Sequence, residues 1–125
     1  MIFEESNKAI YIQIADRICN EILEGHFSPD SRLPSVRDYA GDMQVNANTV
    51  MRSYDRLSQK GIIYNRRGIG FFVASDAKDK ILAEKAEELE DSRIYEFFDL
   101  LYHLNITPED LRKQYIRYLE KKNNK

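Results

Sequence analysis

The sequence is poor in the residues that build disulfides and metal sites, since its 125 residues include one cysteine and two histidines. Because Cys19 stands alone, no disulfide can form within the chain. Cys19 lies in an apolar helical pattern, so packing in the core explains it better than redox sensing. His26 and His103 are isolated and have no metal-ligand spacing around them. The sequence therefore predicts no metal ion and no cofactor.

The motifs of common enzyme classes are missing as well. The sequence contains no P-loop, no G-x-S-x-G elbow and no Cys/His constellation. An acidic run near residue 90 is better explained as the solvated face of a helix than as a metal or acid–base site. Its members are Glu84, Glu87, Glu88, Glu90 and Asp91. We therefore expect no catalytic residue and no enzymatic activity.

Long hydrophobic runs are also absent. No apolar stretch approaches the roughly 18 residues that a membrane-spanning helix needs, and no N-terminal signal peptide is recognisable. Hydrophobic residues still make up 42% of the chain, which suffices for a buried core in one or two small domains. These features favour a cytoplasmic protein that has no membrane partner.

Charge is distributed unevenly along the chain. The net charge is −2, but residues 32–67 contain seven Lys/Arg and three Asp, a local charge of +4, which leaves −6 for the remainder. A basic surface on an otherwise acidic protein can still bind phosphates, while the acidic remainder limits nonspecific association.

Two short helices joined by a tight turn are predicted within this basic segment. The first covers 35–43, and Ser35 can serve as its N-cap because its hydroxyl can accept a hydrogen bond from a free amide of the first turn. The turn is 44–46. The second helix covers 47–60 and is ended by Gly61, since glycine best tolerates the left-handed conformation that follows a helix.

The second helix has two different faces. Val50, Tyr54 and Leu57 recur at the spacing of a stripe that faces the core. The other side carries short hydrogen-bonding groups and guanidinium groups, which suit base edges and phosphates. These outward residues are Asn48, Thr49, Arg52 and Arg56.

A β-hairpin is predicted directly after this helix. Residues 62–65 and 69–74 are β-rich, with 66–68 (Arg-Arg-Gly) at the tip and Gly70 close behind. Two adjacent arginines repel each other unless an anion lies nearby. Helix, turn, helix and a cationic wing at 62–74 together make a winged helix-turn-helix, whose second helix is placed to enter a DNA major groove.

This stretch closely resembles the N-terminal DNA-binding domain of the GntR family of bacterial transcription regulators. The resemblance extends upstream to about Ile10 and covers roughly the first 75 residues. The residues that carry it are Leu33-Pro34-Ser35-Val36-Arg37, Val45-Asn46, Asn48-Thr49-Val50, Tyr54, Leu57, Gly61, Arg66-Arg67-Gly68-Ile69-Gly70 and Phe72-Val73.

Two residues depart from the family pattern, because Asp30 and Gln44 stand where members usually carry glycine. Aspartate tolerates turn conformations. Gln44 in a left-handed conformation would be strained by about 1 kcal/mol.

The pattern and the resemblance together define candidate DNA contacts. For Arg37, a DNA contact is implied by the resemblance, and the alternative is an ion pair with Asp38 or Asp42. N-terminal capping is the alternative for Asn48 and Thr49, and a solvated hairpin tip is the alternative to insertion of the wing arginines into the minor groove. The full set is Ser35, Arg37, Asn46, Asn48, Thr49, Arg52, Arg56, Arg66, Arg67, Gly68 and Gly70.

A third helix, predicted over 9–24, would support the helix-turn-helix. Its isoleucines recur every four residues from Ile10 to Ile22, and Gly25 ends it. The alternative, a helix that binds a partner, leaves the DNA-binding helices without a third element to close their core. The first domain is expected to cover 1–75.

The remaining residues, 76–125, are predicted to form two helices. The first runs from Ala77 to about Leu104 and changes from highly charged to apolar, and Asn105 can close it. Thr107, as N-cap, and Pro108 start the last one.

Two helices of this size cannot close a core of their own, so we expect a twofold-symmetric homodimer that matches a palindromic operator. The alternative is a monomer in which both helices fold back on their own winged domain. The aromatic residues of this region could also line a pocket for an unidentified small-molecule effector, although core packing explains them better. The residues predicted to form the dimer are Ile94, Phe97, Phe98, Leu101, Leu104, Leu111 and Tyr115.

The predicted fold is therefore mainly α with a small β-hairpin wing, followed by a helical dimerisation region. A short C-terminal region of this kind resembles the YtrA-type subfamily. The predicted function is a sequence-specific, double-stranded DNA-binding transcriptional regulator, a homodimeric repressor. The alternative is a winged-helix module for protein assembly, which has no need of Arg66 and Arg67 beside Gly68.

Overall fold

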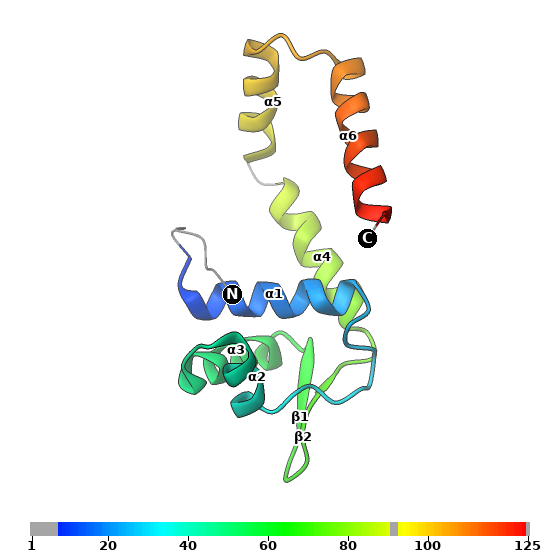
Figure 1. Cartoon of the computed structure of the whole chain (residues 1–125). Coiled ribbons are helices and arrows are strands. Elements are labelled where there is room, and N and C mark those ends of the chain that lie inside the picture. Colours follow the sequence, from blue (N-terminus) through cyan, green and yellow to red (C-terminus); the bar gives the residue numbers. More distant parts are fainter. Residues whose placement is uncertain (1–7, 91–92, 125) are drawn as a thin grey trace. The chain divides into compact units, whose positions relative to one another are not determined.

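The computed structural model describes residues 8–90 and 93–124 and divides the chain into two compact units, Met1–Lys85 and Ala86–Lys125. It confirms a mainly helical fold with a single two-stranded antiparallel sheet among the described residues (Figure 1). No helix in that part of the chain is both long and apolar enough to cross a membrane. In chain order the elements are α1 (Ile10–Leu23), α2 (Val36–Met43), α3 (Ala47–Gln59), β1 (Ile63–Arg66), β2 (Gly70–Val73), α4 (Ala77–Glu90), α5 (Arg93–His103) and α6 (Pro108–Asn123).

Helix α1 supplies the predicted isoleucine stripe, although the stripe starts one turn later than expected. Ile14, Ile18 and Ile22 are fully buried, whereas Ile10, the first residue of the helix, is 49% exposed because it lies beyond the packed part of α1. Cys19 is half-buried against this core, and burial raises the pKa of its thiol to about 11. A thiol with so high a pKa is unreactive at neutral pH, which agrees with a packing role.

The helix-turn-helix forms as predicted, and local hydrogen bonds mark its ends. The Ser35 hydroxyl accepts a hydrogen bond from the Asp38 amide at 3.1 Å and so caps α2. Gln44 adopts the left-handed conformation (φ 57°) that the turn requires. Helix α3 ends at Gln59, one residue earlier than predicted, and Gly61 follows it with φ 73°.

Helix α3 buries the predicted stripe, since Val50, Tyr54 and Leu57 are at most 1% exposed. Ser53 belongs to the same face, which the sequence did not indicate. Its hydroxyl donates to the Tyr11 carbonyl at 2.7 Å and thereby ties α3 to α1. A buried hydroxyl is tolerated here because it has an acceptor.

Tyr54 connects α3 to several other segments. Its hydroxyl donates to the Pro34 carbonyl at 2.7 Å, in the loop that leads into α2. Its ring meets Phe71 of β2 edge-on, with centroids 5.1 Å apart, and Tyr39 of α2 at 6.3 Å. Desolvation raises the pKa of Tyr54 above its usual value, so the hydroxyl stays protonated and able to donate.

The wing differs from the prediction at its tip. Arg66 is the last residue of β1 and pairs with Gly70, so the tip is 67–69 rather than 66–68. The Ile69 amide donates to the Arg66 carbonyl at 2.8 Å, and Gly68 takes φ 78°, as the third residue of a type II turn does. The prediction was wrong because the pairing register places Arg66 inside the ladder.

A third segment lies along β2. Arg32 forms an isolated antiparallel bridge with Phe72, and Leu33 donates to the Phe71 carbonyl at 2.8 Å. The segment around Arg32 therefore adds an isolated β-bridge, and not a third strand, to the edge of the wing. Figure 1 shows the hairpin projecting beyond α2 and α3, away from α1.

The first unit continues past the predicted domain boundary at residue 75. Ala77 and Ile81 of α4 are buried in its core. Glu84 forms a half-buried ion pair with Lys60, so this residue does not belong to a solvated acidic face. The neighbouring acids Glu87, Glu88 and Glu90 are exposed as predicted, and Asp91 lies outside the described residues.

The second unit contains α5 and α6. Neighbouring residues define the end of α5 and the start of α6. The single helix predicted over 77–104 corresponds to two helices, α4 and α5. The residues between them, 91 and 92, lie outside the described part of the chain. Asn105 takes φ 57° after α5, as expected of a closing residue. Thr107 and Asp110 form a reciprocal capping box that starts α6, and these hydrogen bonds lower the pKa of Asp110.

We predict that Tyr54→Phe lowers the free energy of unfolding by about 1–2 kcal/mol, because it leaves the half-buried Pro34 carbonyl without its donor. Denaturant unfolding followed by circular dichroism measures this loss. Tyr64→Phe is the control, since Tyr64 is 37% exposed on the wing. Equal stability of the Tyr54→Phe protein and the unsubstituted one would contradict the prediction.

Candidate DNA-binding surface

The start of α3 presents the predicted polar side chains. Asn48 and Arg52 are exposed, and Thr49 and Arg56 are half-buried. The cap of this helix is Asn46, whose side-chain oxygen accepts a hydrogen bond from the Asn48 amide at 2.8 Å. The capping role that was the alternative for Asn48 and Thr49 is therefore filled by Asn46, and the Asn48 side chain faces solvent.

Arg52 is held against α1. Its guanidinium carbon lies 4.0 Å from the centroid of the Tyr11 ring, which is a cation–π contact. Both residues line a hollow of about 250 Å³ together with Asp55, Arg56 and Gln59. Nothing in the local sequence pattern indicated a role for Tyr11 in the site, so its contact with α3 was missed.

Helix α2 presents Arg37 in its first turn. Arg37 is exposed, and neither Asp38 nor Asp42 comes within 4.0 Å to pair with it. The ion pair that was the alternative for this residue is therefore not formed. Ser35 uses its oxygen for the helix cap and keeps its hydroxyl hydrogen for a further acceptor.

The wing separates its two arginines. Arg66 lies on one face of the hairpin, with its guanidinium carbon 5.2 Å from the Phe72 ring centroid, whereas Arg67 lies in the turn with Gly68. Arg32 joins them from the adjoining segment, because a Cβ on Gly70 would come within 3.0 Å of the Arg32 Nε. Sequence reasoning counted Arg32 toward the local charge but did not include it in the site.

The charges of this surface are not neutralised within the chain. Among the described residues, no carboxylate oxygen comes within 4.0 Å of a guanidinium nitrogen of any arginine between positions 32 and 67. Three cations elsewhere in the first unit are paired, in Lys8–Asp16 (3.0 Å), Arg17–Glu21 (3.6 Å) and Lys80–Asp76 (3.4 Å). The six arginines are Arg32, Arg37, Arg52, Arg56, Arg66 and Arg67.

A winged helix-turn-helix with an unneutralised arginine surface is the arrangement of a DNA-binding domain. Residues 10–73 match the family described as "Bacterial regulatory proteins, gntR family". The chain belongs to the GntR family. It is therefore a transcriptional regulator with a DNA-binding domain rather than an enzyme, as the sequence predicted.

Other proteins of this family are similar to different portions of this chain. A crystal structure of a GntR-family transcriptional regulator from Bacteroides thetaiotaomicron is 47% identical, with a TM-score of 0.69, over 91% of this chain and 99% of that one. The transcriptional repressor YtrA from Bacillus subtilis is 36% identical over 80 residues, which are 64% of this chain and 62% of YtrA. These matches confirm the family assignment, including its similarity to YtrA-type members.

A relative has also been solved with DNA. The DNA-binding domain of AraR in complex with operator ORR3 is 26% identical, with a TM-score of 0.52, over 59% of this chain and 89% of that one. The first unit of this GntR protein therefore shares its fold with the AraR domain that was crystallised in complex with an operator.

We predict that Arg52→Ala weakens binding to a specific DNA site by about 1–3 kcal/mol if Arg52 reads a base. Tyr11→Ala should reproduce part of this loss, because it frees the guanidinium, whereas Tyr11→Phe keeps the ring and should bind normally. Fluorescence anisotropy with the specific duplex measures both effects. Unchanged affinity of Arg52→Ala would remove this residue from the contact surface.

Proposed function

We propose that this GntR protein is a cytoplasmic homodimeric repressor that binds a palindromic operator. Helix α3 would enter the major groove, and the wing would lie beside it at the minor groove. The observation that carries the proposal is the set of arginines between positions 32 and 67 with no carboxylate within 4.0 Å. Phosphates would supply the missing negative charge.

The proposed contacts follow from exposure and geometry. Asn48, Thr49, Arg52 and Arg56 lie on the side of α3 opposite its buried stripe, where they can reach base edges and phosphates. The start of α2 would add backbone contacts, and positive φ at Gly68 and Gly70 lets the wing approach the duplex closely. The residues that would serve at the starts of α2 and α3 are Ser35, Arg37 and Asn46.

The relatives support a repressor that recognises an operator. YtrA is a repressor by its name, and AraR is seen bound to operator DNA. The alternative of a protein-assembly module leaves the exposed arginines of the wing without a role.

Dimerisation is proposed from the apolar surface of the second unit. No residue of α5 or α6 is buried. Of the sixteen exposed large hydrophobic residues in the described chain, eleven lie between 89 and 119. Surface of this kind marks an interaction site. Among the predicted dimer residues, Ile94, Leu101 and Leu111 are half-buried, whereas Phe97, Phe98, Leu104 and Tyr115 are exposed.

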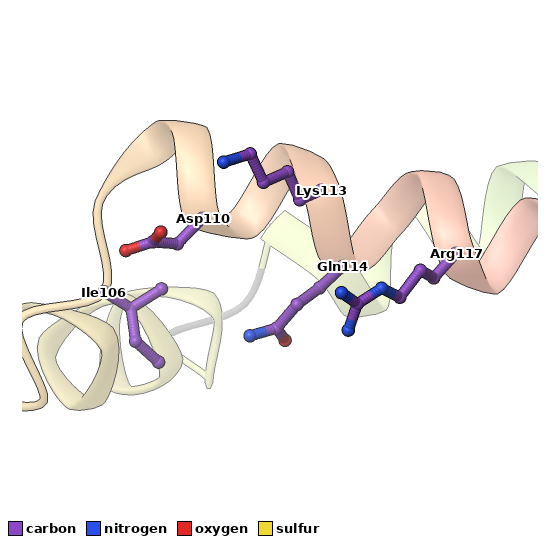
Figure 2. A pocket seen from close by; sticks show the side chains of 5 residues that line it. All are labelled: Ile106, Asp110, Lys113, Gln114 and Arg117. Atoms are coloured by element: carbon purple, nitrogen blue, oxygen red, sulfur yellow. The ribbon is translucent and has the colours of Figure 1, made fainter.

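The proposal includes a small-molecule effector without an assigned site. The second unit has a hollow of about 250 Å³ lined by Ile106 and the polar face of α6 (Figure 2). The aromatic residues that the sequence offered as an effector pocket do not line it. Its polar members are Asp110, Lys113, Gln114 and Arg117.

DNA binding should be strongly salt-dependent, because each phosphate contact releases counterions. Selection from a random duplex pool should give a palindromic sequence, and the logarithm of its affinity should fall linearly with the logarithm of the salt concentration. A mixed-sequence duplex is the control and should bind at least ~10³-fold more weakly. Binding that is undetectable at low salt, or indifferent to salt, would overturn the proposal.

In solution the mass should be twice the chain mass of 14.7 kDa. We predict that Phe98→Lys weakens the dimer about tenfold or more, since it removes a large apolar side chain from the interface and adds a charge. Multi-angle light scattering across a concentration series measures this. Glu96→Lys, on the same helix, is the matched control and should stay dimeric. A single-chain mass for the unsubstituted protein would exclude the dimer.

A further inference from the structure

One face of the wing brings together side chains from three chain segments. In an antiparallel pair, directly opposite residues project to the same face, and alternate residues share that face. Tyr64 pairs with Phe72, and Arg66 pairs with Gly70, so these four share one face. Arg32 bridges Phe72 from the other side, which places its side chain on this face as well.

The shared face has an aromatic floor. The rings of Tyr64 and Phe72 stack, with centroids 5.7 Å apart and planes 19° apart. The Arg66 guanidinium carbon lies 5.2 Å from the Phe72 centroid. Aromatic faces attract guanidinium groups and hold them flat while their N–H donors remain available.

Gly70 leaves room for the second guanidinium. A Cβ at Gly70 would lie 3.0 Å from the Nε of Arg32 and 3.3 Å from its Nη2. Arg32 therefore reaches across Gly70, the direct partner of Arg66 in the ladder. The two arginines flank the same glycine, one from each side of β2.

Neither guanidinium group is paired with a carboxylate among the described residues. Arg32 and Arg66 are exposed, and within residues 8–90 and 93–124 no carboxylate comes within 4.0 Å of either one. Like charges on one small face repel each other, and an anion between them removes that cost. A phosphate group suits this position, because guanidinium N–H donors match phosphate oxygens in bidentate geometry.

We infer that Arg32 and Arg66 form a phosphate clamp across Gly70 and that this pair, rather than the neighbouring Arg66 and Arg67, holds the DNA backbone. The inference rests on the proposed function and adds Arg32, a residue outside the helix-turn-helix, to the DNA-binding surface. The partner is a backbone phosphate of duplex DNA. Arg67, in the turn, makes a separate contact or none.

Arg32→Ala tests the clamp, because the bridge to Phe72 is held by backbone hydrogen bonds of Ser31 and Leu33 and survives the change. Binding is measured with the selected duplex and with a mixed-sequence duplex over a series of salt concentrations. We expect affinity to fall on the order of tenfold for both duplexes, and the slope of log K against log salt to become about 0.9 smaller. Arg32→Lys should recover part of the affinity, since it keeps the charge and loses the bidentate geometry.

Lys78→Ala is the matched control, because it removes one exposed positive charge from the same unit, away from the wing. Thermal unfolding confirms that each variant is folded. If Arg32→Ala behaves like Lys78→Ala while the unsubstituted protein binds DNA, the clamp is wrong and the proposed function stands. If the unsubstituted protein binds neither duplex at low salt, the proposed function itself fails.

A double-mutant cycle tests whether the two arginines share one phosphate. Two residues on one phosphate are coupled, so the loss in the Arg32→Ala, Arg66→Ala double variant should be smaller than the product of the single losses. For the Arg32→Ala, Arg67→Ala double variant, the fold-loss of affinity should instead equal the product of the two single losses. Multiplicative losses in both pairs would overturn the shared clamp.

Discussion

The DNA-binding unit depends on the buried face of α3, where Tyr54 contacts the loop at Pro34, helix α2 and strand β2. The ring packs against α2 and β2, and the hydroxyl donates to the carbonyl of Pro34 at 2.7 Å. Ser53, next to it, ties the same face to α1. Because one side of α3 is held by α1, α2 and the wing at once, its other side is presented in a fixed orientation. Under the proposed function, a fixed outward face reduces the entropy that the helix loses when it binds DNA.

The parts of the fold that were predictable from sequence are those governed by neighbours in the chain. The cap at Ser35, the left-handed Gln44 and the N-cap at Thr107 need only a few adjacent residues, and all three form. The failures involve distant partners. Ile10 fits the helical repeat but stays half exposed, and Arg66 looks like a tip residue until the pairing with Gly70 places it in the ladder.

The same distinction applies to the candidate site. Residue type and helical spacing identified the arginines of α2, α3 and the wing, since these lie within one motif. Tyr11 and Arg32 reach the surface through contacts with residues about 40 positions away in the sequence, at 4.0 Å from Arg52 and beside Gly70. No spacing rule encodes such contacts, so only the folded chain could reveal them.

The end of α3 is fastened to α4. Lys60, which caps α3, forms an ion pair with Glu84, and Lys80 donates to the Gly61 carbonyl at 3.1 Å. Helix α4 is also the segment through which the chain passes into its second unit. These two contacts therefore join the last turn of α3 to the first turns of α4, so removing either Glu84 or Lys80 loosens the C-terminal end of α3.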